Sequence, residues 1–120
     1  RLLNVDNTKW NASMLAGLNY YKEKQFFSDG RSLWRIPKEF PVEIHNQSQG
    51  IITFLNFAFL DKKYSDFSKT IAEWTIENMQ DKSGYFYYRK LKFYTNKISY
   101  MRWSNAWMFL ALSRSISDPK

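Results

Sequence analysis

A short polar segment, residues 43–49, holds the only histidine of the chain between groups that could assist it. Glu43 places a carboxylate two residues before His45, and the amides of Gln47 and Gln49 follow. An unperturbed imidazole changes its charge near neutral pH, so His45 can act as a general acid or base. Glu43 and His45 are therefore catalytic candidates, and Gln47 and Gln49 are substrate-binding candidates. The alternative is a helix cap beside a structural histidine.

A second candidate cluster, residues 102–107, combines a guanidinium group with two indoles. Trp103 and Trp107 are four residues apart and would share one face of a helix, with Arg102 directly before Trp103. Aromatic planes stack on sugar rings, and the arginine fork fits a carboxylate, sulfate or phosphate group. Arg102 and Trp103 are substrate-binding candidates, whereas core packing is the favoured role of Trp107.

Aromatic and cationic side chains are interleaved in residues 84–97. Such a mixture suits an anionic sugar, a single-stranded nucleic acid or a membrane surface. Tyr87 and Arg89 are further substrate-binding candidates. Tyr94 joins His45 as a candidate for moving a proton.

The composition excludes several classes of site. The chain has no Cys and one His, which rules out disulfides and thiolate metal sites and argues against a histidine-rich metal centre. It also lacks a glycine-rich phosphate loop, a G-x-S-x-G elbow and an H-E-x-x-H motif. We expect no metal and no cofactor.

The net charge of +7 is concentrated in the two loops that precede the apolar segments. The cations in or just after these loops are Arg31, Arg35, Lys38, Arg89, Lys90, Lys92, Lys97 and Arg102. A basic rim attracts anionic ligands, although the same charge also serves simply to keep a protein soluble. We expect an anionic saccharide as the partner, ahead of nucleic acid. No apolar run approaches the length of a membrane span, and we expect a cytoplasmic protein.

Four helices are predicted from the pattern of apolar residues. The segments 10–26 and 65–79 carry one apolar stripe each, which is typical of helices with one wet side. The segments 47–60 and 101–114 are apolar nearly all round, which predicts buried helices. In the second long loop, residues 85–94 read as a small β-hairpin that turns at Arg89 and Lys90.

The two halves of the chain repeat this plan. A shift of 56 residues places Ser48 on Ser104 and Gln49 on Asn105. A period of one helical hairpin is typical of stacked or ringed repeats. We expect a single domain over residues 1–120, with one repeat at about 8–60 and the other at about 65–115.

With these repeats in view, residues 74–88 and 100–107 resemble segments of α/α-toroid proteins. This ring of helical hairpins is found in six-hairpin glycosidases, sugar epimerases and polysaccharide lyases, and the chain is most similar to uncharacterised bacterial members linked to surface polysaccharide metabolism. The resemblance implies an all-α fold of two toroid hairpins, an incomplete ring, with a small β-hairpin in the second long loop. It implies either the C-terminal fragment of a larger toroid or self-association.

The resemblance also implies a carbohydrate-active or carbohydrate-binding function, in polysaccharide biosynthesis or modification. If the protein is an enzyme, we expect acid–base chemistry of the hydrolase, lyase or epimerase type on a uronic-acid-like sugar, with His45 or Tyr94 moving the proton. The alternative is a non-catalytic helical-repeat module that binds protein or nucleic acid through its basic aromatic rim. A purely structural subdomain is the third interpretation.

Overall fold

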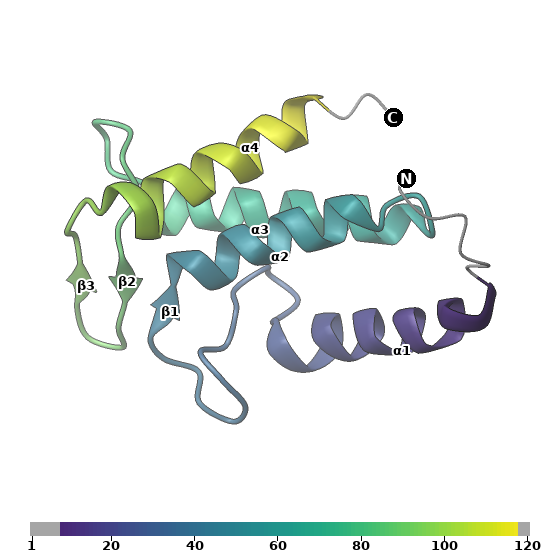
Figure 1. Ribbon diagram of the computed structural model, residues 1–120. Helices are drawn as coiled ribbons and strands as arrows, with labels where there is room; N and C mark the ends of the chain where they lie inside the picture. The colour runs from purple at the N-terminus through teal and green to yellow at the C-terminus, as the bar shows by residue number, and fades with distance from the viewer. Residues whose placement is uncertain (1–7, 118–120) are drawn as a thin grey trace.

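Helices make up most of the computed structural model, which describes residues 8–117, and a small sheet lies at one end of them (Figure 1). The α-helices are α1 (Thr8–Gln25), α2 (Ile44–Asn56), α3 (Lys62–Met79) and α4 (Trp107–Ser117). A π-helical turn, η1 (Met101–Ala106), leads directly into α4. The strands are β1 (Val42–Glu43), β2 (Arg89–Lys90) and β3 (Thr95–Asn96). The prediction of a mostly helical fold with a small β-hairpin is confirmed at this level.

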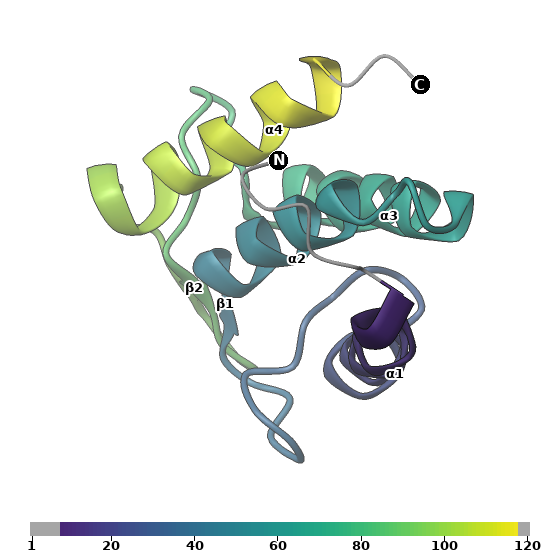
Figure 2. The same ribbon diagram turned by 45° about the vertical axis from the view of Figure 1, so that its right-hand side comes forward.

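Helix α2 lies at the centre of the fold, between α1, α3 and α4 (Figure 2). Phe54 of α2 anchors the core, with ring centroids 5.1 to 5.9 Å from those of Tyr21, Phe26, Tyr64 and Phe67. Aromatic pairs at these separations add to the stabilisation from burial alone. The prediction of a buried helix is therefore confirmed for most of α2, whereas Asn56 is exposed and Phe59, also in the predicted segment, is 77% exposed.

The end of α2 differs from the predicted position, residue 60. The helix stops at Asn56, and residues 57–60 form a tight turn closed by a hydrogen bond from the Leu60 N–H to the Phe57 carbonyl, 3.0 Å long. Asp61 then caps α3, because its side chain accepts a hydrogen bond from the Lys63 N–H at 2.9 Å. Such a cap satisfies one of the free N–H groups of a first helical turn. The apolar run thus continues through a turn that apolar periodicity cannot detect.

Helix α4 is not the buried helix that its composition predicts. Only Met108 and Ala111 are buried along it, whereas Phe109 is 77% exposed and Ile116 is 86% exposed. Within residues 8–117, helix packing on α4 comes mainly from α2, so the opposite side of α4 has no covering helix. The prediction of burial on all sides is wrong for this helix.

The sheet is antiparallel, in the order β1-β2-β3, with Glu43 opposite Arg89 and Arg89 opposite Asn96. The predicted hairpin exists, but its register is wrong. Arg89 and Lys90, the predicted turn, form strand β2, and residues 91–94 make the turn, closed by a 2.8 Å hydrogen bond from the Leu91 N–H to the Tyr94 carbonyl. Residues 85–87 cannot serve as the strand because they belong to another turn that folds back onto the end of α3.

The chain contains two equivalent turns, one after α1 (residues 26–32) and one after α3 (residues 80–86), which lie 54 residues apart. In each turn the first residue bridges to the last, and the paired residues are Phe26 with Ser32 and Gln80 with Phe86. Gly30 and Gly84 hold the same position with φ values of 93° and 106°, a region that favours glycine. The repeat is therefore present in the backbone, with an offset of 54 in the turns.

The offset is larger in the helices that follow the turns. The side-chain oxygen of Gln47 accepts the Ser32 N–H at 2.8 Å, and that of Asn105 accepts the Phe86 N–H at 2.8 Å. These equivalent amides are 58 residues apart, because the β2–β3 hairpin lengthens the second loop. Gln47, rather than Gln49, is the structural counterpart of Asn105.

Candidate functional site

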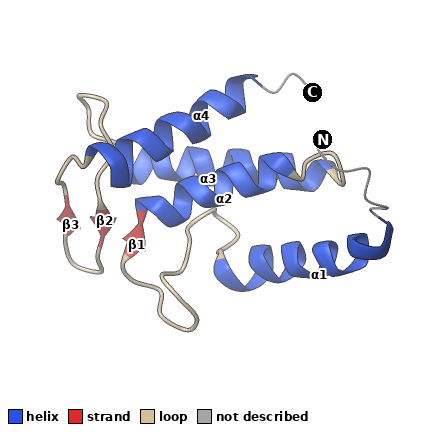
Figure 3. Ribbon diagram, viewed as in Figure 1, coloured by secondary structure: helices blue, strands red, loops and turns tan. Residues whose placement is uncertain are grey.

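The sheet brings the starts of two helices together. β1 leads directly into α2, and β3 leads through a short connection into η1 (Figure 3). Because β2 is antiparallel to both neighbours, β1 and β3 run in the same direction, so both helices begin at the same end of the sheet. Four residues of interest lie in or directly after these helix starts, and the rings of two of them, His45 and Trp107, are in contact. We call His45, Arg102, Trp103 and Trp107 the helix-start cluster.

His45 and Trp107 join the two halves of this cluster. Their rings meet edge to face, with centroids 5.3 Å apart and an interplanar angle of 83°. The Nδ1 atom of His45 is buried and has no hydrogen-bond partner among the described residues. Glu43, the residue before α2, makes no capping hydrogen bond with its side chain, so this residue does not provide the helix cap of the alternative interpretation. The imidazole is therefore held by aromatic packing.

Trp103 and Arg102 form the exposed part of the cluster. Trp103 is 59% exposed, and Trp107, for which core packing was the favoured prediction, is still 37% exposed. Arg102 is exposed as well, and its guanidinium makes no ion pair or hydrogen bond with any residue in the range 8–117. The start of η1 thus exposes an indole and, at the preceding residue, a guanidinium without an ion-pair partner among the described residues.

Glu43 and Arg89 form an ion pair across the β1–β2 ladder. The Arg89 Nη2 atom lies 2.9 Å from Oε2 of Glu43, and its Nε donates to the same oxygen at 3.1 Å. The guanidinium carbon also lies 4.6 Å from the centre of the Tyr88 ring, a cation–π contact. The carboxylate predicted to be catalytic is therefore already engaged in an ion pair with Arg89. This pair joins β1 to β2 next to the cluster.

Gln47 has a structural environment. Its side chain is fully buried, and its Nε2 donates to the Gly30 carbonyl at 3.1 Å and to the Thr75 hydroxyl at 2.8 Å. With the oxygen bound to the Ser32 N–H, both amide donors and the acceptor are engaged. Gln49, by contrast, is half-buried with no side-chain hydrogen bond to the described part of the chain.

Tyr94 does not join His45. It precedes β3 whereas His45 follows β1, so the two residues lie at opposite ends of the sheet and two strands apart (Figure 1). At the usual strand spacing, the offset across the sheet alone is about 10 Å. The Tyr94 side chain is 65% exposed at the turn between β2 and β3. The two proton-transfer candidates are therefore separate groups.

Tyr87 belongs to a third location, the second turn. Its hydroxyl donates to Oδ1 of Asp81 at 3.0 Å, and the Lys97 ammonium lies 5.2 Å from its ring centre. Hydrogen bonds from Ser83, and then from Tyr87, hold the pKa of Asp81 below its usual value. Burial and the Asp81 carboxylate raise the pKa of Tyr87. Asp81 is a site residue that was not selected from the sequence, although a turn-forming Asp two residues before Ser83 is a recognisable pattern.

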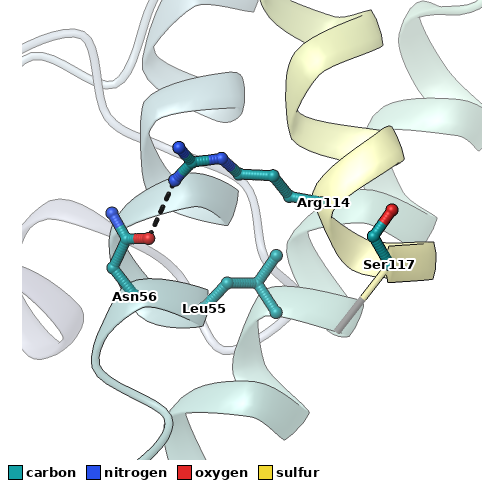
Figure 4. A pocket seen from close by; sticks show the side chains of 4 residues that line it. All are labelled: Leu55, Asn56, Arg114 and Ser117. Atoms are coloured by element: carbon teal, nitrogen blue, oxygen red, sulfur yellow. Dashed lines mark hydrogen bonds between the residues drawn. The ribbon is translucent and has the colours of Figure 1, made fainter. Parts of the chain in front are cut away.

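A hollow of about 180 Å³ lies at the other end of the helices (Figure 4). It is lined by Leu55 and Asn56 of α2 and by Arg114 and Ser117 of α4. The Arg114 guanidinium donates to the Asn56 side-chain oxygen at 2.9 Å, so the one cation of the hollow is already partnered. The hollow has no group suited to catalysis.

Comparison with known proteins gives no relative to guide the assignment. No protein-family model, curated protein or solved structure matches the chain. None of the helices in residues 8–117 combines the length and apolar character that crossing a membrane requires. In the same residues, no group of three or more acidic or histidine side chains is arranged to hold a metal ion.

Proposed function

We propose that the helix-start cluster binds an anionic saccharide. The observation that carries this proposal is the exposure of both Trp103 and Arg102, consecutive residues at the start of η1, with no partner for the Arg102 guanidinium among the described residues. A sugar ring can stack on the indole, while the arginine fork pairs with a carboxylate or sulfate on the same ring. Either interaction alone is weak, so the pairing favours a charged sugar over a neutral one.

The surrounding charge supports the same ligand class. The ion pair between Glu43 and Arg89 removes the acidic group that would repel an anion. Lys90 lies in the same strand, and Lys97 follows β3, so the sheet carries an excess of positive charge toward the cluster. Such a field raises the local concentration of an anionic ligand.

Of the three candidate catalytic residues, the proposal keeps His45. Glu43 is paired with Arg89, and Tyr94 lies at the far end of the sheet. His45 contacts Trp107 within the cluster, and an imidazole is the side chain most often used as a general acid or base. In this proposal His45 is the residue that exchanges a proton with the bound sugar if the protein is catalytic.

The test is titration calorimetry with a short oligogalacturonate, using wild type, Arg102→Ala and Trp103→Ala. We expect each substitution to weaken binding about tenfold, which corresponds to about 1.4 kcal/mol. Arg114→Ala is the matched control, because it removes the same type of side chain from the other end of α4. No binding by wild type, or unchanged binding by Arg102→Ala, contradicts the proposal.

A second titration separates sugar from nucleic acid as the anionic ligand. A single-stranded oligonucleotide should bind more weakly than the oligogalacturonate. Tighter oligonucleotide binding that falls steeply with added salt would instead assign the surface to nucleic acid, because bound counterions are released from phosphates. A neutral oligosaccharide of equal length measures the contribution of the charge.

A further inference from the structure

The uncovered side of α4 corresponds to a side of α2 that is fully covered. One helical turn beyond the amides that bind the two turns, Gln47 and Asn105, lie Ile51 and Phe109. Ile51 is completely buried, and its carbonyl accepts a hydrogen bond from the Ser68 hydroxyl of α3 at 3.1 Å. Phe109 is instead 77% exposed. Ile51 and Phe109 are therefore equivalent positions, but α3 covers Ile51 and no helix among the described residues covers Phe109.

The two equivalent glycines show the same difference. A Cβ atom on Gly30 would lie 2.7 Å from the Thr70 carbonyl oxygen and 2.8 Å from the Ile71 Cα, so the backbone of α3 closes directly on the first turn. A Cβ atom on Gly84 would meet nothing within 4 Å. The second turn projects past the start of α4 (Figures 1 and 2). The second turn thus has no helix where the first turn has α3.

We propose that helix α1 of a second copy of the chain covers this face, as α3 covers the equivalent face of α2. The face consists of the Gly84 turn, Phe109 and Ile116, and we call it the outer face. Helix α1 is the counterpart of α3, since both have 18 residues and both end directly before their turn. The contact would continue, between copies, the interface that already joins the two halves within one copy.

The surface of α1 fits this role sterically. The residues of α1 equivalent to Thr70 and Ile71, 54 positions earlier, are Ala16 and Gly17. Both are exposed, and a Cβ atom on Gly17 would meet nothing within 4 Å. Small residues on α1 would permit at Gly84 the close backbone approach that α3 makes at Gly30. An exposed apolar side chain such as Phe109 then gains burial on association.

The contact joins different surfaces of the two copies, so it is heterologous. In such an assembly, the copy at one end has an uncovered outer face, and the copy at the other end has an α1 whose exposed side is not in contact with another copy. This arrangement leads to rings or open chains rather than to a closed dimer. Each chain carries a net charge of +7, so the copies repel each other and added salt should strengthen the association. None of the helix-start cluster residues takes part, so the contact is independent of the proposed saccharide site.

Sedimentation velocity over a range of protein concentrations tests the contact. Wild type should form species larger than a monomer, and Phe109→Glu should shift the midpoint concentration at least tenfold upward. Phe59→Glu is the matched control, because Phe59 is also 77% exposed but belongs to the turn that connects α2 to α3, away from the outer face. A wild type that stays monomeric at every concentration, or equal effects of the two substitutions, overturns the proposal.

Cross-linking tests the orientation. The chain has no cysteine, so Ala16→Cys and Ser83→Cys variants each introduce one unique thiol. An oxidised mixture of the two variants should give a mixed disulfide dimer far faster than either variant alone. Ser83→Cys pairing preferentially with itself would indicate a symmetric contact and would overturn the head-to-tail arrangement.

Discussion

Gln47 and Asn105 hold the same backbone position in the two halves of the chain, each with its side-chain oxygen 2.8 Å from the N–H that ends a turn. Gln47 also donates to α3, through Thr75, whereas Asn105 donates to Ser99, Tyr100 and Ser104, all within the six residues before it. One extra methylene group therefore lets Gln47 span to the neighbouring helix. This single side chain therefore links the central helix α2 both to the first turn and to α3.

Gln47→Ala should be strongly destabilising. It leaves the Ser32 N–H, the Gly30 carbonyl and the Thr75 hydroxyl without this partner in a buried site. Each buried polar group left unpaired costs about 1 to 3 kcal/mol, so we expect a loss of about 3 to 5 kcal/mol in the free energy of unfolding. Urea unfolding followed by circular dichroism measures this loss. Gln49→Ala is the control, because the Gln49 side chain is half-buried and makes no hydrogen bond to the described residues. It should change the free energy of unfolding by less than about 0.5 kcal/mol.

Alanine at the two turn glycines should separate backbone strain from steric overlap. Both positions have positive φ, which costs alanine about 1 to 2 kcal/mol. Gly84→Ala should show this cost alone. Gly30→Ala also forces Cβ against the backbone of α3 and should cost at least about 3 kcal/mol. Equal losses in thermal or urea unfolding would show that α3 does not pack closely against the first turn.

The Glu43–Arg89 pair should couple β1 to β2 weakly and in a salt-dependent manner. A double-mutant cycle with Glu43→Gln and Arg89→Gln isolates the interaction from the other contacts of each residue. Partly exposed cross-strand ion pairs contribute about 0.5 to 1 kcal/mol, and the coupling should fall in 0.5 M salt. A coupling energy of zero at low salt would contradict the ion pair.

Asp81→Asn should lower the pKa of Tyr87. Burial raises the pKa of Tyr87 first, and the Asp81 carboxylate raises it further by accepting the phenolic hydrogen bond. Removal of the negative charge leaves the effects of burial and of the neighbouring Tyr85, so the tyrosinate should form at a lower pH. Tyrosinate absorbance during alkaline titration, with Tyr87→Phe to identify the signal, provides the measurement. Asp29→Asn is the control at the equivalent first turn, where the carboxylate accepts only the Arg31 N–H; an equal shift in that variant would show that the effect is not local.

Apolar periodicity was sufficient to predict that four helices exist, because the residues that face a core follow local spacing, but it did not predict the end of α2 or the π-helical turn before α4. The strands were harder, since a two-residue strand is defined by its partner: Arg89 is in β2 because Glu43, 46 residues away, pairs with it. The exposure of α4 could not be predicted either. An apolar helix is buried only if another element covers it, and Phe109 has none within the described residues.

For the candidate site too, the sequence identified some features and missed others. Arg102 and Trp103 stand out by residue type, and adjacency in the sequence already places them together. The contact of His45 with Trp107 depends on β1 and β3 running in the same direction, which residue types do not encode. The separation of Tyr94 from His45 has the same cause. A pattern can therefore identify side chains with suitable chemistry, while the sheet decides which of them meet.

The stability of the fold should fall at alkaline pH because of Tyr21. Its ring packs against Phe26 and Phe54, and burial raises the pKa of its hydroxyl to about 12. The unfolded chain ionises near pH 10, so the folded state binds more protons between these values. The stabilisation is complete below pH 10 and is lost as the pH rises to about 12, a total of about 2 to 3 kcal/mol. Urea unfolding at pH 9 and pH 11.5 should show this loss in wild type and in the exposed neighbour control Tyr20→Phe, but a smaller loss in Tyr21→Phe. Parallel losses in all three proteins would assign the alkaline sensitivity to other groups.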